Sequence, residues 1–156
     1  MIFYYTYTKM INFISRKESA LLLPHIQQKQ VVPLYGSLIP AGFPSPADDF
    51  LEKKIDLNEY MIRNKAATFL VRVKGESMSG AGICDGDILV VDRSVSPRDQ
   101  HIIVGALDGE FTVKRLVQEK GRTFLQAENP NYPTIEIKEG QEFTVWGVVT
   151  FAIHNL

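Results

Sequence analysis

Two side chains in this sequence could act as a nucleophile and its base, Ser77 and Lys114. Ser77 lies in Gly75-Glu76-Ser77-Met78, after a segment with strand character and before a stretch of small residues. A serine at such a junction can present its Oγ to solvent, and the backbone N–H groups of Ser77 and Met78 can face a developing oxyanion. Because most serines in glycine-containing turns only shape the turn, the motif alone does not decide the chemistry.

A serine hydroxyl is a weak nucleophile and needs a base beside it. The three histidines give poor support for a Ser-His-Asp triad. His25 lies in residues 1–50, which have no regular hydrophobic pattern, and His154 lies almost at the C-terminus. The third histidine is His101.

Lys114 is the better candidate base. Strand alternation along residues 110–116 places Lys114 on the same face as Leu116. Burial beside Leu116 would lower the pKa of the lysine, and a neutral amine can accept the serine proton. The alternative is an exposed strand lysine without a chemical role.

Two further features are interpreted as structural. Asp85-Gly86-Asp87 lacks a third and fourth metal ligand at suitable spacing, so a polar turn is preferred and we expect no metal and no cofactor. Cys84 is the only cysteine, and no histidine lies near it in the sequence. It cannot form an intrachain disulfide, which indicates a reducing, cytoplasmic compartment.

Composition argues against several classes of partner. The chain of 156 residues carries a formal net charge of -1, which argues against a protein that binds DNA by neutralising many phosphates and against a polybasic membrane anchor. No apolar run reaches the roughly 18 residues that a membrane-spanning helix needs. We therefore expect no membrane association and no signal peptide.

The predicted fold is mostly β. Residues 1–50 show no stable period, and the prolines and glycines of 33–46 predict an extended N-terminal arm, with a disordered tail as the alternative. Residues 51–156 form the predicted β-rich domain, with a helix over 57–63 capped by Asp56 and a hairpin turn at Asp108-Gly109. The strands are predicted over 69–73, 88–91, 102–107, 110–116, 123–127, 135–137 and 143–153.

Four blocks of sequence together resemble the UmuD branch of the LexA-type self-cleaving peptidases, over about residues 33–152. The combination of these blocks, in order and at these separations, is specific. They are Ala41-Gly42-Phe43-Pro44-Ser45-Pro46-Ala47, Gly75-Glu76-Ser77-Met78, Asp85-Gly86-Asp87 and Asp108-Gly109-Glu110-Phe111-Thr112-Val113-Lys114.

The resemblance implies a small LexA/UmuD-like catalytic domain with a cleavable arm, in which Ser77 is the nucleophile, Lys114 the base and Ala41–Gly42 the bond cut. It also implies a homodimer of the SOS DNA-damage response whose self-cleavage is stimulated by a RecA filament on single-stranded DNA. The product, Gly42 to Leu156, would join a UmuC-like Y-family DNA polymerase for error-prone translesion synthesis, without sequence-specific DNA binding of its own. Ala41 departs from the cysteine of the best-known enteric UmuD and leaves the subgroup open.

Two other functions remain as alternatives. One is a non-enzymatic dimeric module that binds the polymerase and carries a vestigial Ser–Lys pair. The other is a LexA or phage-repressor-like regulator that lacks its DNA-binding domain, since residues 1–32 are too short for a winged helix-turn-helix.

Overall fold

The computed structural model describes residues 31–35 and 51–156, which belong to two compact units. The first unit, His25–Arg63, contains the strands β1 (Val31–Tyr35) and β2 (Leu51–Asp56) and the helix α2 (Leu57–Met61). The second contains the remaining described residues, 64–156. The predicted mostly β fold is confirmed, whereas the arm segments 1–30 and 36–50, with Ala41 and Gly42, lie outside the described residues.

In the first unit, β1 and β2 form a two-stranded antiparallel ribbon in which Pro33 is opposite Lys54. The strand β1 was not expected from the sequence, because Pro33 counts against a strand. A two-stranded ribbon has only edge strands, and proline is tolerated at an edge because its missing N–H need not face a partner. The predicted Asp56 cap is confirmed, since its carboxylate accepts the N–H of Asn58 at 2.8 Å. The helix ends at Met61, two residues before the predicted end.

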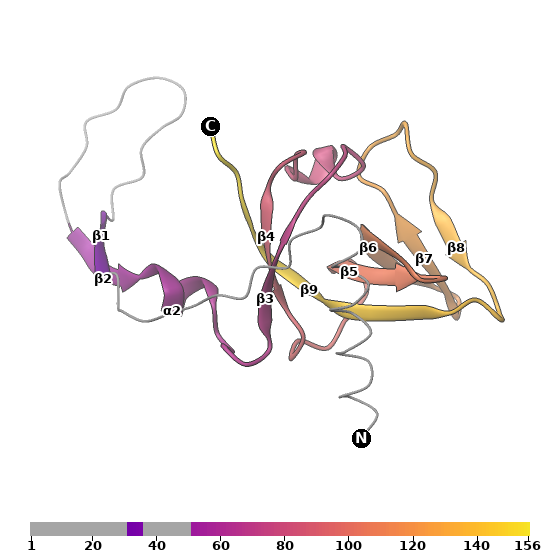
Figure 1. The fold of residues 1–156 in the computed structure, drawn as a ribbon, viewed down its shortest axis with the longest axis horizontal. Helices are drawn as coiled ribbons and strands as arrows, with labels where there is room; N and C mark the ends of the chain where they lie inside the picture. The colour runs from indigo at the N-terminus through magenta and orange to yellow at the C-terminus, as the bar shows by residue number, and fades with distance from the viewer. Residues whose placement is uncertain (1–30, 36–50) are drawn as a thin grey trace. The chain divides into compact units, whose positions relative to one another are not determined.

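The second unit is built on a seven-stranded antiparallel sheet with the order β3-β4-β9-β5-β6-β7-β8 (Figure 1). The long strand β9 connects the two halves of this sheet. The C-terminal part of β9 pairs with β4, and its N-terminal part pairs with β5. The strands are β3 (Thr68–Arg72), β4 (Ile88–Asp92), β5 (Ile102–Leu107), β6 (Glu110–Glu119), β7 (Arg122–Gln126), β8 (Ile135–Ile137) and β9 (Phe143–Ile153).

The hairpin of β5 and β6 confirms the turn that the sequence predicts. Asp108 and Gly109 have φ values of 50° and 85°, so both central residues occupy the left-handed region that a type I′ turn requires. The turn fixes the register in which Ile103 lies opposite Lys114. The position of Lys114 in the sheet therefore follows from a turn signal that ends five residues before it, at Gly109.

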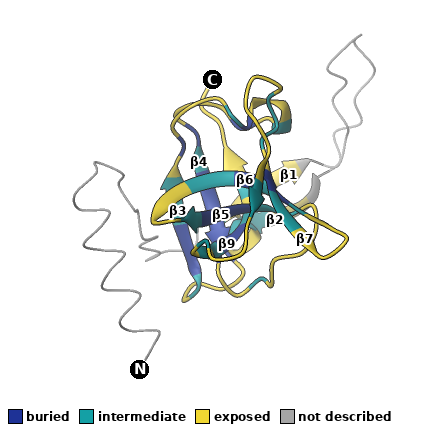
Figure 2. Ribbon diagram, turned by 90° about the vertical axis from the view of Figure 1, so that its right-hand side faces the viewer, coloured by how far each residue is buried: buried dark blue, intermediate teal, exposed yellow. Residues whose placement is uncertain are grey.

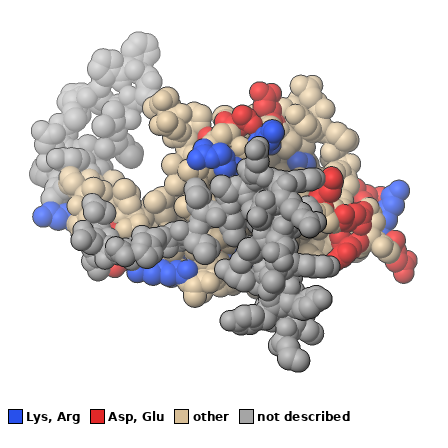
Figure 3. Space-filling model, in the orientation of Figure 1, with Lys and Arg blue, Asp and Glu red and all other residues tan. Residues whose placement is uncertain are grey.

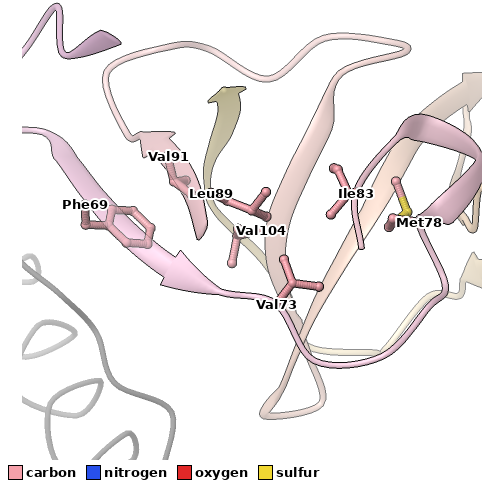
Figure 4. Packing of buried hydrophobic residues seen from close by; sticks show 7 residues of the cluster. All are labelled: Phe69, Val73, Met78, Ile83, Leu89, Val91 and Val104. Carbon is pink, nitrogen blue, oxygen red and sulfur yellow. The ribbon is translucent and has the colours of Figure 1, made fainter. Parts of the chain in front are cut away.

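Apolar side chains pack on both faces of the sheet, because neighbouring residues of β5 point to opposite sides. Ile103 packs with Leu116, Leu125 and Val148 on one face, whereas Val104 belongs to a cluster on the other. Burial is concentrated along β4 and β5, and most turn residues are exposed (Figure 2). The cluster around Val104 also contains Phe69, Val73, Met78, Ile83, Leu89 and Val91 (Figure 4).

Figure 3 shows the charges on one face of the molecule. Basic and acidic side chains are interspersed on the face shown in Figure 3, and no extended basic surface is visible among the described residues there. In the described part of the chain, no helix is both long enough and apolar enough to cross a membrane.

Candidate active site

Ser77 lies in the segment that leads from β3 into the short 3₁₀ turn η1 (Ser79–Ala81), and its side chain is half-buried. The next residue anchors this segment, because the Met78 side chain is only 2% exposed and packs in the core cluster with Val73 and Ile83 (Figure 4). The preceding turn is held by the N–H of Gly75, which donates to the carboxylate of Asp85. The backbone on both sides of Ser77 is thus fixed to the domain.

Lys114 extends from the middle of β6 and meets Ser77. Its Nζ lies 2.8 Å from Ser77 Oγ and donates a second hydrogen bond, of 3.0 Å, to the backbone oxygen of Val113. Only 8% of the residue is exposed, and Leu116 on the same strand face is buried as well. The structure brings together the two side chains that the sequence analysis paired, with Lys114 on the buried face that strand alternation predicts.

Burial lowers the pKa of Lys114 from its ordinary value of 10.5, because the charged ammonium loses solvation. Among the described residues, no carboxylate lies within ion-pair distance of its Nζ to oppose this effect. In the charged form the amine donates to Ser77 Oγ, whereas in the neutral form its lone pair can accept the Oγ–H over the same distance. The site is therefore suited to take a proton from a serine hydroxyl.

The backbone N–H groups of Ser77 and Met78 are available next to the hydroxyl. Within the residues that the structure describes, neither N–H donates to a protein acceptor. The N–H of Ser79, by contrast, donates to the backbone oxygen of Glu76 at 3.2 Å. Unused N–H groups beside a nucleophile can stabilise the negative oxygen of a tetrahedral intermediate. Their location fits the oxyanion role that the sequence analysis expects.

A clamp formed by the segment after β7 holds the serine loop in place, and sequence reasoning missed it. The N–H of Glu128 donates to the backbone oxygen of Ser77 at 2.9 Å, and the backbone oxygen of Glu128 accepts the N–H of Gly80 at 2.6 Å. Asn129 adds a bond from Nδ2 to the backbone oxygen of Glu76 at 2.9 Å. These contacts run mostly through the main chain, so no residue type could have signalled them.

Glu128 is itself fixed by an ion pair. Arg115 donates from Nε to the Glu128 carboxylate and from Nη1 to the backbone oxygen of Gln100 at 2.6 Å. Both charged side chains are about three-quarters buried, with exposed fractions of 25% and 23%. Arg115 follows Lys114 directly and points to the other face of β6, so one strand supplies both the candidate base and the support for the serine loop.

The described histidines have other partners. His154 Nδ1 lies 2.7 Å from an Asp87 oxygen, and His101 Nδ1 accepts the N–H of Arg98 at 3.3 Å. Neither ring is hydrogen-bonded to Ser77, in agreement with the preference for a lysine base over a triad. Ala41 and Gly42 belong to the undescribed segment 36–50, so their position relative to Ser77 stays a prediction.

The described fold is an antiparallel sheet that brings a buried lysine to a loop serine. Residues 33–150 match the Peptidase S24-like family, and the chain belongs to this family of serine peptidases. It is 48% identical to protein SamA of Salmonella typhimurium over 138 residues, covering 86% of this chain and 96% of SamA.

Two further relatives come from Escherichia coli. Protein ImpA is 43% identical over 134 residues, covering 85% of this chain and 90% of ImpA. Protein MucA is 41% identical over 123 residues, covering 78% of this chain and 84% of MucA. Together with the family match, these relatives confirm the expectation of a UmuD-like protein of the LexA type.

Proposed function

We propose that this chain is a self-cleaving serine peptidase of the bacterial SOS response that cuts its own Ala41–Gly42 bond, with Ser77 as nucleophile and Lys114 as general base. The observation that carries the proposal is the 2.8 Å separation of Lys114 Nζ and Ser77 Oγ at a desolvated lysine. Membership of a serine peptidase family supports it.

The proposed reaction proceeds by acyl transfer. Neutral Lys114 accepts the Ser77 proton while Oγ attacks the carbonyl carbon of Ala41, and the N–H groups of Ser77 and Met78 stabilise the oxyanion. The carbon–nitrogen bond then breaks, and Lys114 gives its proton to the amine of Gly42. A water molecule, deprotonated by Lys114, hydrolyses the ester on Ser77 and releases the carboxylate of Ala41.

The cleaved bond is part of the same chain as the nucleophile. A tethered substrate has a high effective concentration, so a slow serine–lysine pair can still complete a single turnover. Alanine and glycine on either side of the bond leave the backbone accessible to the nucleophile.

The biological role is proposed from the UmuD-like relatives. The protein would act as a cytoplasmic homodimer, respond to a RecA filament on single-stranded DNA, and pass its product, Gly42 to Leu156, to a UmuC-like Y-family polymerase. A pull-down of the polymerase by the full chain and by a chain that starts at Gly42 tests this role. Equal capture of both would show that cleavage does not control the partnership.

The cleavage test uses the purified full-length protein at neutral and alkaline pH, read by intact mass. We expect a fragment starting at Gly42 that forms faster as the pH rises, because more Lys114 becomes neutral. Ser77→Ala and Lys114→Ala should abolish it, whereas the control variants Ser79→Ala and Lys138→Ala should cleave like the parent.

Two outcomes would refute the mechanism. One is Ser77→Ala cleaving at the parent rate. The other is a parent protein that stays intact at every pH and also after addition of a RecA filament.

A further inference from the structure

Three residues at one end of the large sheet place metal-binding atoms close together. Cys84, Asp87 and His154 each offer one ligand atom, and these atoms all lie within 4.8 Å of one another. The sheet explains the meeting of two of them, because Ile88 of β4 lies opposite Ile153 of β9. In an antiparallel pair, the residue before Ile88 then faces the residue after Ile153.

A tight turn adds the third residue. The N–H of Cys84 donates to Asp87 Oδ2 at 2.8 Å, and the N–H of Asp87 donates back to the oxygen of Cys84 at 3.2 Å. The Asp87 side chain is 3% exposed, whereas half of the His154 side chain is exposed and its Nδ1 lies 2.7 Å from Asp87 Oδ1. A fixed carboxylate is thus flanked by two side chains at the surface.

We propose that Cys84, Asp87 and His154 form a binding site for Zn²⁺. Thiolate sulfur, imidazole nitrogen and carboxylate oxygen are the ligands that zinc prefers, and three protein ligands leave the fourth position of a tetrahedron to water. Binding requires the thiol to lose its proton to solvent, so zinc uptake releases protons. The ion replaces the direct contact between His154 and Asp87.

The geometry requires only local adjustment. Metal–ligand bonds of about 2.0–2.3 Å place the ligand atoms of a tetrahedral site roughly 3.2–3.6 Å apart. Rotation of the surface side chains of Cys84 and His154 can bring them to this spacing, while Asp87 stays in its turn. Asp85-Gly86-Asp87 lacks a third and fourth metal ligand at suitable spacing in the sequence, but the strand register brings His154 to Asp87 from 67 residues away.

Zinc at this position would tie the C-terminal end of β9 to the segment that carries Ser77. The backbone oxygen of Asp87 accepts the N–H of Val73, and Asp85 holds Gly75. The turn is therefore hydrogen-bonded to the residues that precede Ser77, and a bound ion would make this turn more rigid. The site does not depend on the proposed peptidase mechanism.

The test is a titration of the metal-free, full-length protein with Zn²⁺ alone, followed by calorimetry. We expect one equivalent to bind, and Cys84→Ser and His154→Gln to weaken binding at least ~10-fold, as losses around metal sites commonly do. His101→Gln is the matched control and should bind like the parent. Asp87 is left unchanged because its buried carboxylate supports the turn.

A second measurement identifies the sulfur ligand. Co²⁺ in place of Zn²⁺ should give thiolate-to-cobalt charge-transfer absorption in the parent and not in Cys84→Ser. The proposal is overturned if the parent binds no zinc, if both variants bind as tightly as the parent, or if the cobalt complex lacks thiolate absorption. Circular dichroism of each variant confirms that it is folded, so that weaker binding reports the lost ligand.

Discussion

Glu128 and Ser77 are joined through their main chains, with the N–H of Glu128 donating to the backbone oxygen of Ser77 at 2.9 Å. The backbone oxygen of Glu128 accepts in turn from Gly80, three residues further along the serine loop. The segment after β7 therefore holds the serine loop on both sides, and we expect it to influence the distance from Ser77 Oγ to Lys114 Nζ. Changes at this clamp should affect the proposed cleavage without altering the side chain of Ser77 or Lys114.

Gly80→Ala should damage both stability and cleavage. A Cβ at this position would collide with the backbone oxygen of Glu128, so the loop must move away from its clamp. Overpacking of this kind typically lowers the free energy of unfolding by ~1–3 kcal/mol. Urea unfolding and the rate of fragment formation measure the two effects.

The control for this change is Ser79→Ala in the same turn, at an exposed position. It should leave both quantities near the parent values. Parent-like cleavage by Gly80→Ala would mean that the clamp does not position Ser77.

Arg115→Ala should destabilise the domain far more than Arg122→Ala. Both arginines pair with a glutamate, but the Arg115–Glu128 pair is mostly buried whereas Arg122 and Glu136 are 58% and 38% exposed. Loss of Arg115 leaves a mostly buried carboxylate without its charged donor, at a cost of ~1–3 kcal/mol. Loss of the exposed pair should change the free energy of unfolding by at most ~0.5 kcal/mol.

Chemical unfolding of both variants measures this difference, and self-cleavage should slow only in Arg115→Ala. Equal effects of the two substitutions would show that the buried pair gives the serine loop no special support.

Local sequence patterns are enough to predict the strands of the seven-stranded sheet. Asp108-Gly109 identified the hairpin because a two-residue turn needs positive φ, and residue alternation then placed Lys114 on the buried face with Leu116. The strand β1 was missed because Pro33 argues locally against a strand, and only its pairing with β2 makes it one.

The supports of the site could not be predicted, because they depend on long-range register. Glu128 meets Ser77 through backbone atoms that every residue possesses, and nothing in its side chain indicates this role. His154 meets Asp87 only because β4 and β9 pair as they do. Side-chain type suggested the pairing of Ser77 with Lys114, whereas the residues that hold the serine loop emerged only from the folded sheet.

Lys114→Met should stabilise the folded protein at neutral pH. The folded-state pKa of Lys114 lies below its ordinary value of 10.5, so between these two values the unfolded chain binds more protons than the folded chain. The stability of the parent must therefore rise with pH across that window. Methionine keeps the buried chain but removes the charge, which should add on the order of 1 kcal/mol at neutral pH.

The advantage of methionine should shrink as the pH rises through the window up to 10.5 and vanish above it, where the parent lysine is neutral in both states. Urea unfolding across the alkaline range measures it, with Ser77→Ala present in both proteins to prevent cleavage. Lys138→Met, at an exposed position, is the control. A constant difference between parent and Lys114→Met at every pH would contradict a depressed lysine pKa.

Cleavage at Ala41–Gly42 should release β1 from β2. The bond lies between these strands in the sequence, so a cut leaves the five residues of β1 and the six of β2 joined only by hydrogen bonds. An isolated two-stranded ribbon is marginal in water. We expect the fragment ending at Ala41 to dissociate, which would leave the backbone groups of β2 free to pair with another chain.

Hydrogen exchange of residues 51–56 should therefore accelerate after cleavage, and equally in a chain expressed from Gly42, while the β5–β6 hairpin exchanges as before. Unchanged protection of β2 in both samples would show that its order does not come from β1.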